Sequence, residues 1–587
     1  MTHSTAYQRF MAELKRRHVL KVVAVYAAAA FAVMQAADFL VPALRLPEVF
    51  ATAVAFTAIV GFPFAVALAW VFDLTPQGVK RTDPASSEEL EAIVAESRSR
   101  RWGAGIIALT ATIVFIIGGW WVIRDKPDNG SQPSGGVAPS IAVLPFVNLS
   151  GDPQDEYFSD GLAEELMNAL GRIPDLRVAA RTSAFAFKGQ NVDVRQIGEE
   201  LGVATVLEGS VRRSGDRVRI RAQLINVTDG FRLWAESYDR ELTDIFVIQD
   251  EIAQAIVTEM RVALTGEPGS LVPSLTQNFE AYNHYLRGRH FWNQRTLYAF
   301  YEAIDEFNQA IALDPDYARA YAGLAETYVL LPEYGGPTVS EVLPDARAAT
   351  EKALALDPNL AEAYAASGYR KYQFEWDWVG AEADFQRAIT LDPEYATARQ
   401  WYAELLLTLR RFEEALAESR AAFALDPLAP AGNLVLAMNL EVAGRADEAI
   451  ARYKATLELA PDFTLARYFL AMAYVQQGDI ARADSTFREL AQRSGSDAAP
   501  YRAYIAALAD PQRMDSALPL LTSGEVFHFI EGSGYLATMG LVEETVAVLE
   551  EAYRERQPYL PMANGLSVYE GLRSDSRFLD FLGKMGL

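Results

Sequence analysis

Few side chains in this sequence have the types and spacing that catalysis or metal binding requires. The five histidines are His3, His18, His284, His290 and His528. None of them stands at metal-ligand spacing from an acidic partner on an expected helix. His284 and His290 flank one expected helix, where ordinary packing or solvation is the simpler interpretation. We therefore expect no catalytic residue, no cofactor site and no metal site.

One acidic loop could in principle bind calcium, which prefers clustered oxygen ligands. Its members are Asp152, Asp155, Glu156 and Asp160. Their order differs from that of an EF-hand, so a solvated turn followed by acids at a helix start is the favoured interpretation.

Composition and missing motifs exclude several function classes. The sequence has no phosphate-binding loop, no dinucleotide-binding glycine motif and no nucleophile elbow. It has no cysteine, which excludes disulfides, thiolate catalysis and cysteine-ligated zinc. A net charge of −24 argues against binding to a nucleic-acid backbone. We expect a protein that is not an enzyme and does not bind nucleic acid.

Prolines recur at a nearly constant interval in the second half of the chain. They are Pro315, Pro358, Pro393, Pro427 and Pro461, spaced 43, 35, 34 and 34 residues apart. A period of about 34 residues predicts repeated helix pairs. Because one pair cannot bury its apolar face alone, such pairs stack into a superhelix whose concave surface can hold another chain.

Small residues recur inside each repeat, where two helices must approach closely. Counterparts 34 residues apart are Ala437 and Ala471, Gly444 and Gly478, and Ala449 and Ala483. The pattern resembles the tetratricopeptide repeat (TPR), which implies an all-α superhelix of about six repeats over 278–495. Helix breakers at 332–337 explain the long first interval as an insertion. A helical extension is expected over 496–587.

In the tetratricopeptide family, exposed positions of the first helix of each pair line the peptide-binding groove. The resemblance transfers this role by register to Arg319, Glu326, Tyr369, Tyr372, Gln400, Glu404, Met438, Glu441, Tyr468 and Met472. For any one of these residues, inter-repeat packing or solvated charge is an equally good interpretation. As a set they predict a groove that grips an extended peptide or a helix through apolar anchors, with a preference for basic ends.

The stretch 139–265 has the pattern of a small α/β domain, with short apolar strands and amphipathic helices. Distinctive runs are Ile-Ala-Val-Leu-Pro-Phe at 141–146, Tyr-Phe-Ser-Asp-Gly-Leu at 157–162, Leu-Glu-Gly-Ser-Val at 207–211 and Leu-Trp-Ala-Glu-Ser-Tyr-Asp-Arg at 233–240. They resemble the TolB amino-terminal-like domain of Gram-negative bacteria, which commonly precedes tetratricopeptide repeats. The resemblance implies a binding module.

Three apolar runs at 19–41, 49–72 and 103–123 predict transmembrane helices within a membrane region over 1–125. Basic residues gather before the first run and between the second and third. The positive-inside rule therefore puts the amino terminus in the cytoplasm and the body in the periplasm of a bacterial inner membrane. Residues 126–138 have the composition of a flexible linker.

The expected fold class is thus a multidomain protein with three transmembrane helices, a small α/β TolB-like domain and an all-α TPR superhelix. The expected function is a membrane-anchored, protein-binding scaffold or sensor with partners among cell-envelope proteins. The alternative is a signal-transducing receptor component that couples binding to a cytoplasmic effector in a cyclase-like or regulator-like pathway. Such an effector would dock at the charged loop 73–102.

Overall fold

The computed structural model describes most of the chain after residue 138. The described residues are 139–173, 176–260, 276–495, 497–522 and 529–587, with 72–75, 78–81 and the isolated positions 22, 26, 29, 33 and 62. The chain separates into two units, Met1–Gly135 and Gly136–Leu587. In the first unit, β1 (Phe72–Thr75) pairs antiparallel with β2 (Gly78–Arg81), so that Phe72 lies opposite Arg81.

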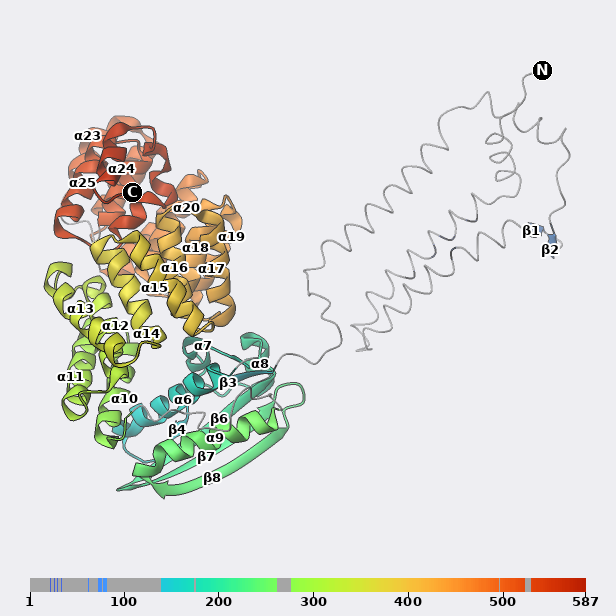
Figure 1. Ribbon diagram of the computed structural model, residues 1–587. Coiled ribbons are helices and arrows are strands. Elements are labelled where there is room, and N and C mark those ends of the chain that lie inside the picture. Colours follow the sequence, from blue (N-terminus) through green and yellow to red (C-terminus); the bar gives the residue numbers. More distant parts are fainter. Residues whose placement is uncertain are drawn as a thin grey trace, which may run out of the picture. The chain divides into compact units, whose positions relative to one another are not determined.

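The second unit begins with a mixed sheet in the strand order β5-β3-β6-β7-β8 (Figure 1). The strands are β3 (Ser140–Val143), β4 (Val147–Asn148), β5 (Arg177–Val178), β6 (Thr205–Ser214), β7 (Arg217–Asn226) and β8 (Arg232–Glu241). β6 runs parallel to β3 and β4 and antiparallel to β7, which pairs antiparallel with β8.

Helices cover both faces of this sheet because β3 is apolar on both. Ile141 and Val143 lie in the larger core with the residues of α6 (Glu156–Gly171), which also contacts α9 (Ile245–Glu259). The alternate residues of β3 lie in a smaller core with side chains of α8 (Val194–Leu201). A β-strand presents successive side chains to opposite faces, so continuous burial of β3 requires a cover on each side.

Six consecutive helix pairs follow within the described residues (Figure 1). They are α10 (Phe279–Asn293) with α11 (Leu297–Leu313), α12 (Ala318–Leu330) with α13 (Val339–Leu356), α14 (Ala361–Arg370) with α15 (Trp378–Leu391), α16 (Ala396–Thr408) with α17 (Phe412–Leu425), α18 (Pro430–Val442) with α19 (Ala446–Leu459), and α20 (Thr464–Gln476) with α21 (Ile480–Ser494). We call the first helix of each pair its A helix.

Close packing between pairs depends on small residues beside large ones. The ring of Phe307 on α11 lies between Gly288 on α10 and Gly323 on α12. A Cβ atom at either glycine would stand 2.5 Å from that ring, well inside contact distance. Gly288 and Gly323 are therefore required by close helix packing, whereas the repeat glycines Gly444 and Gly478 follow their A helices with a φ of 75° and 76° and have open space around them.

Two irregular segments interrupt the pairs. The breakers at 332–337 form a 3-10 turn, η4 (Leu331–Tyr334), and Gly335 follows it with a φ of 77°. After α14 comes a π-helical turn, η5 (Lys371–Glu375), which ends at Trp376 with a φ of 60°. Single π turns inside helices often mark sites where other parts of a protein pack or bind.

The chain after the sixth pair continues as helices and short turns that return to the repeats. These are α22 (Ala499–Ala509), α23 (Met514–Leu521), α24 (Phe529–Thr538), α25 (Val542–Glu555), η7 (Leu560–Asn564), η8 (Ser567–Leu572) and α26 (Ser576–Gly583). The turn η7 contacts α16, and the ring of Tyr553 stacks on Trp376 with 5.0 Å between centroids. Trp378 donates a hydrogen bond to the carbonyl of Met585 at 3.0 Å.

The expected fold class is wrong in its membrane part. A helix needs about 20 apolar residues to cross the hydrocarbon core of a bilayer. Within the part of the chain that the structure describes, no helix is both long and apolar enough to do so. The longest described helix, α13, has 18 residues and carries five charged side chains. What the structure shows is a mostly helical, TPR-like body with a small sheet region.

The expected localisation, a bacterial inner membrane with a periplasmic body, is contradicted by the same finding, because it rested on those three helices. The runs 19–41, 49–72 and 103–123 lie outside the described residues apart from isolated positions, as does the expected linker 126–138.

Candidate functional site: the inner face of the repeats

The first two A helices meet the α/β domain through buried ion pairs. Arg289 on α10 bonds to Glu164 on α6 at 2.9 Å and to Glu326 on α12 at 2.7 Å. Glu164 also accepts from Arg181 at 2.8 Å. Burial alone would raise the pKa of Glu164, but the charges of Arg289 and Arg181 outweigh burial and lower it to about 2. This carboxylate is therefore held ionised between the two parts of the unit.

A second buried pair lies one helix further along the superhelix. Arg319 on α12 binds both carboxylate oxygens of Glu165, at 2.9 and 2.7 Å, and reaches Glu362 on α14 at 3.1 Å. Arg319 is 5 % exposed and Glu165 is 4 % exposed. One guanidinium nitrogen thus contacts both oxygens of Glu165 and the other bonds to Glu362, so Arg319 links α6 to two A helices through charge-assisted bonds.

A further edge of the α/β domain reaches the loops between later repeats. Ser183, on the short helix α7 (Arg181–Phe185), donates to Asp426 at 2.5 Å and accepts from the backbone N–H of Leu428 at 2.9 Å. The backbone N–H of Val178 donates to Glu394 at 2.9 Å. The α/β domain thus contacts the repeats at both the first A helices and the loops that precede α16 and α18.

We call the side of the repeats that the A helices form the inner face. Its other end is covered by residues 557–572, which we call the return segment. The backbone N–H of Tyr559 donates to the side chain of Gln373 at 2.8 Å. The amide of Asn564 donates to the carbonyl of Thr408 at 2.8 Å. Gly565 lies so close to α16 that an added Cβ would stand 2.1 Å from the carbonyl oxygen of Leu407. The return segment therefore lies against the inner face much as a bound peptide would.

Between these two covers remains a cavity of about 730 Å³, a volume typical of sites for small molecules. Its lining includes ten carboxylates and four guanidiniums. The carboxylates belong to Glu164, Glu326, Glu333, Glu362, Asp392, Glu394, Glu404, Asp426, Asp462 and Glu531. The guanidiniums belong to Arg181, Arg289, Arg295 and Arg319, and three of them are already paired with carboxylates as described above.

Three of the lining carboxyl groups lie away from the paired arginines. Burial raises the pKa of Glu333 to about 7, although hydrogen bonds from Tyr369 and Tyr559 oppose the rise. Burial raises the pKa of Glu404 to about 8, against a hydrogen bond from Gln400 at 3.1 Å. Burial raises the pKa of Glu531 to about 7. At neutral pH these groups are therefore largely or partly protonated.

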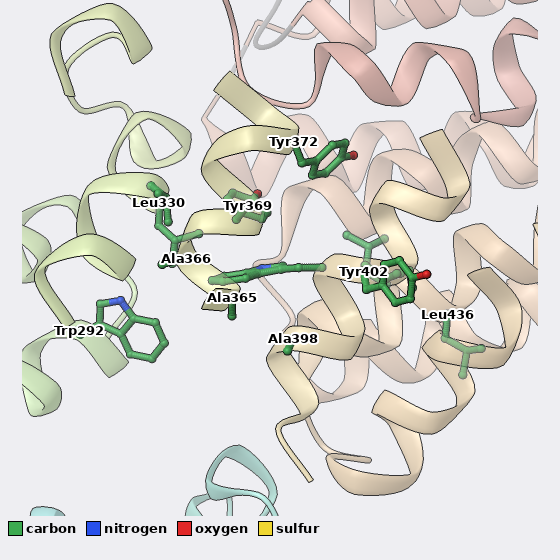
Figure 2. Packing of buried hydrophobic residues seen from close by; sticks show 14 of the residues in the cluster. Trp292, Leu330, Ala365, Ala366, Tyr369, Tyr372, Ala398, Tyr402 and Leu436 are labelled. Carbon is green, nitrogen blue, oxygen red and sulfur yellow. The ribbon is translucent and has the colours of Figure 1, made fainter. Parts of the chain in front are cut away.

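Apolar and aromatic side chains make up the rest of the inner face. Figure 2 shows Leu330, Ala366, Tyr369 and Tyr402 among the buried side chains that successive A helices contribute. The rings of Tyr369 and Trp401 lie 4.5 Å apart between centroids. The cavity thus combines aromatic walls with carboxyl groups.

The structure brings six of the ten predicted groove residues to the cavity and places four elsewhere. Those that line the cavity are Arg319, Glu326, Tyr369, Gln400, Glu404 and Met438. The others are Tyr372, Glu441, Tyr468 and Met472. Tyr372 bonds to Thr408 at 2.9 Å, Tyr468 donates to the carbonyl of Ile530 at 3.1 Å, and Met472 is fully buried. Glu441 accepts from Ser567 of the return segment. Their role in peptide binding stays a prediction.

Sequence reasoning missed the residues that hold the α/β domain and the return segment against the inner face. The helix α6 begins at Glu156, so the buried Glu164 and Glu165 lie in the middle of this helix. Two adjacent acids inside an otherwise buried helix were the available signal, because buried carboxylates need partners. Arg289, Glu333 and Glu531 have no comparable signal in the sequence.

The acidic loop and the histidines have structural partners. Asp152 caps the turn η2 (Pro153–Asp155), and Glu156 and Asp160 bond to Lys188 at 2.7 and 2.6 Å. His284 bonds to Glu306 at 2.6 Å. Among the described residues, no group of three or more histidines and acids could hold a metal ion.

Comparison with known proteins agrees with the helix pairs. Residues 443–508 match the family described as tetratricopeptide repeat, and residues 300–331 match the family described as TPR repeat. The chain contains tetratricopeptide repeats. This part of the prediction from sequence is confirmed, and such repeats suit a protein to protein–protein interaction.

Two curated relatives share part of their length with this TPR protein. It is 43% identical over 205 residues to "Putative adenylate cyclase 3" of Rhizobium meliloti (strain 1021), which is 34% of this chain and 35% of that protein. It is 22% identical over 297 residues to "Transcriptional regulator HilA" of Salmonella typhimurium, which is 50% of this chain and 52% of that protein. The chain thus spans about a third of the first relative and about half of the second.

Two similar solved structures are TPR proteins. One is YrrB, described as having an unusual peptide-binding site, with a TM-score of 0.24, 22% identity, and coverage of 32% of this chain and 91% of that chain. The other is a thermophilic TPR protein of Thermus thermophilus, TTC0263, with a TM-score of 0.28, 21% identity, and coverage of 33% of this chain and 99% of that chain.

We predict that Glu165→Gln lowers the free energy of unfolding by about 3 kcal/mol, because it removes one partner of a buried charge pair and leaves Arg319 undercompensated. The exposed pair of Arg445 and Glu448 provides the control, and Glu448→Gln should cost less than about 0.5 kcal/mol. Urea unfolding followed by circular dichroism measures both. Equal effects of the two substitutions would show that the Arg319 pair does not hold the domains together.

We predict that the protein loses stability as pH rises from about 5 to 8. The pKa values of Glu404 and Glu531 are about 8 and 7 in the folded protein and about 4.5 when unfolded, so the folded state binds more protons in this window. The double variant Glu404→Gln/Glu531→Gln should be flatter across the window and more stable at pH 8, by roughly 1 kcal/mol or more. Thermal unfolding at pH 5, 6.5 and 8 measures this, with Glu413→Gln on the exposed face of α17 as control. An unchanged slope in the double variant contradicts the assignment.

Proposed function

We propose that this chain is a protein-binding scaffold or sensor whose inner repeat face is covered by its own α/β domain until a partner protein replaces that cover. The observation that carries the proposal is the set of buried polar bonds that cross the contact. The α/β domain meets the repeats through Arg289 with Glu164, Arg319 with Glu165, and Ser183 with Asp426, beside apolar packing such as that of the Phe246 and Tyr282 rings, 4.8 Å apart between centroids. A partner that offers equivalent polar groups can replace such bonds, and domains of one chain commonly move relative to each other.

Opening at this contact would release groups suited to binding. Arg319, one of the predicted groove residues, is held by Glu165 of the α/β domain in the covered form, and Arg289, the partner of the groove residue Glu326, is held by Glu164. A partner peptide that supplies carboxylates to Arg319 and Arg289 would replace those bonds without leaving buried charges unpaired. The predicted groove residues thus keep a place in this proposal.

The domain boundaries belong to the same proposal. We assign residues 139–265 to a TolB amino-terminal-like domain and residues 278–495 to the repeat superhelix, with 496–587 as a helical extension. The sheet with helices on both faces supports the first assignment, and the six helix pairs support the second.

A signal-transducing component is the second candidate. The relatives whose names specify an adenylate cyclase and a transcriptional regulator favour it, because parts of this chain recur in proteins with a signalling output. An effector would dock at the loop 73–102, which contains the hairpin of β1 and β2. Replacing 73–102 with a Gly-Ser linker of equal length should abolish effector recovery in affinity purification, while a variant lacking the repeats keeps it. Recovery that survives the loop replacement excludes this docking site.

The scaffold proposal predicts that a disulfide between the α/β domain and the repeats abolishes partner binding. Because the chain has no cysteine, Ser183→Cys with Leu428→Cys introduces one disulfide at a contact where Ser183 Oγ and the Leu428 nitrogen are 2.9 Å apart. We expect partner recovery by affinity purification to fall at least tenfold in the oxidised form and to return on reduction. Ser183→Cys alone is the control for loss of the hydrogen bond. Equal recovery from oxidised and reduced protein would mean that partners bind elsewhere.

A further inference from the structure

The cavity on the inner face has a charge pattern that its protein surroundings leave uncompensated. Its carboxylates outnumber its guanidiniums by ten to four. Arg181, Arg289 and Arg319 are each bonded to carboxylates of the α/β domain. Arg295 stacks on Trp292 with its guanidinium 3.7 Å from the ring centroid. Several carboxyl groups of the lining are therefore left without an arginine partner.

Two of these carboxyl groups, Glu404 and Glu531, lie beside the apolar part of the lining. Glu404 on α16 is 4 % exposed, and its Oε2 atom has no hydrogen-bond partner. Glu531 on α24 is 7 % exposed, and among the described residues no lysine, arginine or histidine forms an ion pair with it. Both side chains line the same cavity. A buried carboxylate without a cation is costly, and these two groups come from different elements, so their position is a property of the assembled cavity.

The walls beside these groups are apolar and aromatic. Trp401 and Phe469 line the cavity together with Met438 and Met562. Aromatic faces attract cations, and methionine adapts to irregular ligands. Metal ions prefer several carboxylate or imidazole ligands in one cluster, and no such cluster occurs among the described residues. The combination of apolar wall and single carboxyl groups suits an amine on an apolar body better than an inorganic cation.

We propose that this cavity binds a small organic cation, an amine or guanidinium carried on an apolar or aromatic body, with Glu404 as its counter-charge and Glu531 as a second carboxyl group of the same lining. The apolar body lies against Trp401 and Phe469, and the cationic head supplies the partner that Oε2 of Glu404 lacks. This site goes beyond protein binding, because it needs no partner protein and exists in the covered form.

A charge series of ligands with one ring system tests the proposal. The purified full chain is titrated by isothermal calorimetry at pH 8 with tryptamine, with its neutral alcohol analogue tryptophol, and with the anion indole-3-propionate. We expect tryptamine to bind at least tenfold more tightly than tryptophol and the anion to show no binding. Equal binding of all three, or no binding of tryptamine up to millimolar concentration, overturns the proposal.

Matched variants locate the site. Glu404→Gln and Glu531→Gln keep the side-chain volume and remove the charge, and each should weaken tryptamine at least fivefold. The double variant should bind tryptamine and tryptophol equally. Glu413→Gln removes an exposed carboxylate on α17 and should bind as the unaltered protein does. Circular dichroism confirms that each variant is folded, and an unchanged affinity in the folded double variant contradicts the assignment. None of these readouts depends on partner recovery, so failure here leaves the scaffold proposal standing, and the converse also holds.

Discussion

The A helices carry large aromatic side chains on their inner face, and this face has to be covered. Tyr369 and Tyr468 are among the largest fully buried side chains of the protein, although a bare superhelix would leave this face open. At about 25 cal/mol per Å² of apolar surface, burying several such rings contributes a substantial share of the stability of a domain. In this chain the cover comes from within: α6 lies against the first A helices, α7 against the loop before α18, and the return segment against the third and fourth pairs.

The two covers differ in their chemistry. The α/β domain is held by arginines that are paired on both sides, as Arg289 is with Glu164 and Glu326. Buried pairs of this kind add little net stability but impose one relative placement, since any other leaves a charge uncompensated. The return segment is held by apolar burial, with Leu560 fully buried, by side-chain hydrogen bonds such as that of Asn564, and by an exposed ion pair of Glu570 with Arg410 at 2.9 Å. Buried ion pairs therefore belong to the α/β domain, whereas the ion pair of the return segment is exposed.

The sequence predicted those features that are encoded locally. Prolines 34 residues apart and small residues at matching offsets lie within one repeat, which is why the tetratricopeptide prediction is confirmed. The covers depend on contacts between residues far apart in the chain: Arg319 and Glu165 are separated by 154 positions, and Glu441 and Ser567 by 126. The repeat period of the sequence carries no information about such pairings. The membrane prediction rested on the length and hydropathy of three runs and on the distribution of basic residues, and it is contradicted because no described helix is both long and apolar enough to cross a membrane.

The return segment also imposes an order on assembly. Asn564 bonds to Thr408, 156 residues earlier in the chain, and the ring of Tyr553 stacks on Trp376, which lies between the two helices of the third pair. Ribosomes release a chain from its amino end, so the middle repeats emerge with their aromatic strip uncovered. Until residues 557–572 are made, that strip is the kind of surface chaperones hold and proteases attack. The inner face is therefore covered only after residues 557–572 have been synthesised. A chain terminated before them would expose aromatic side chains that are buried in the complete fold.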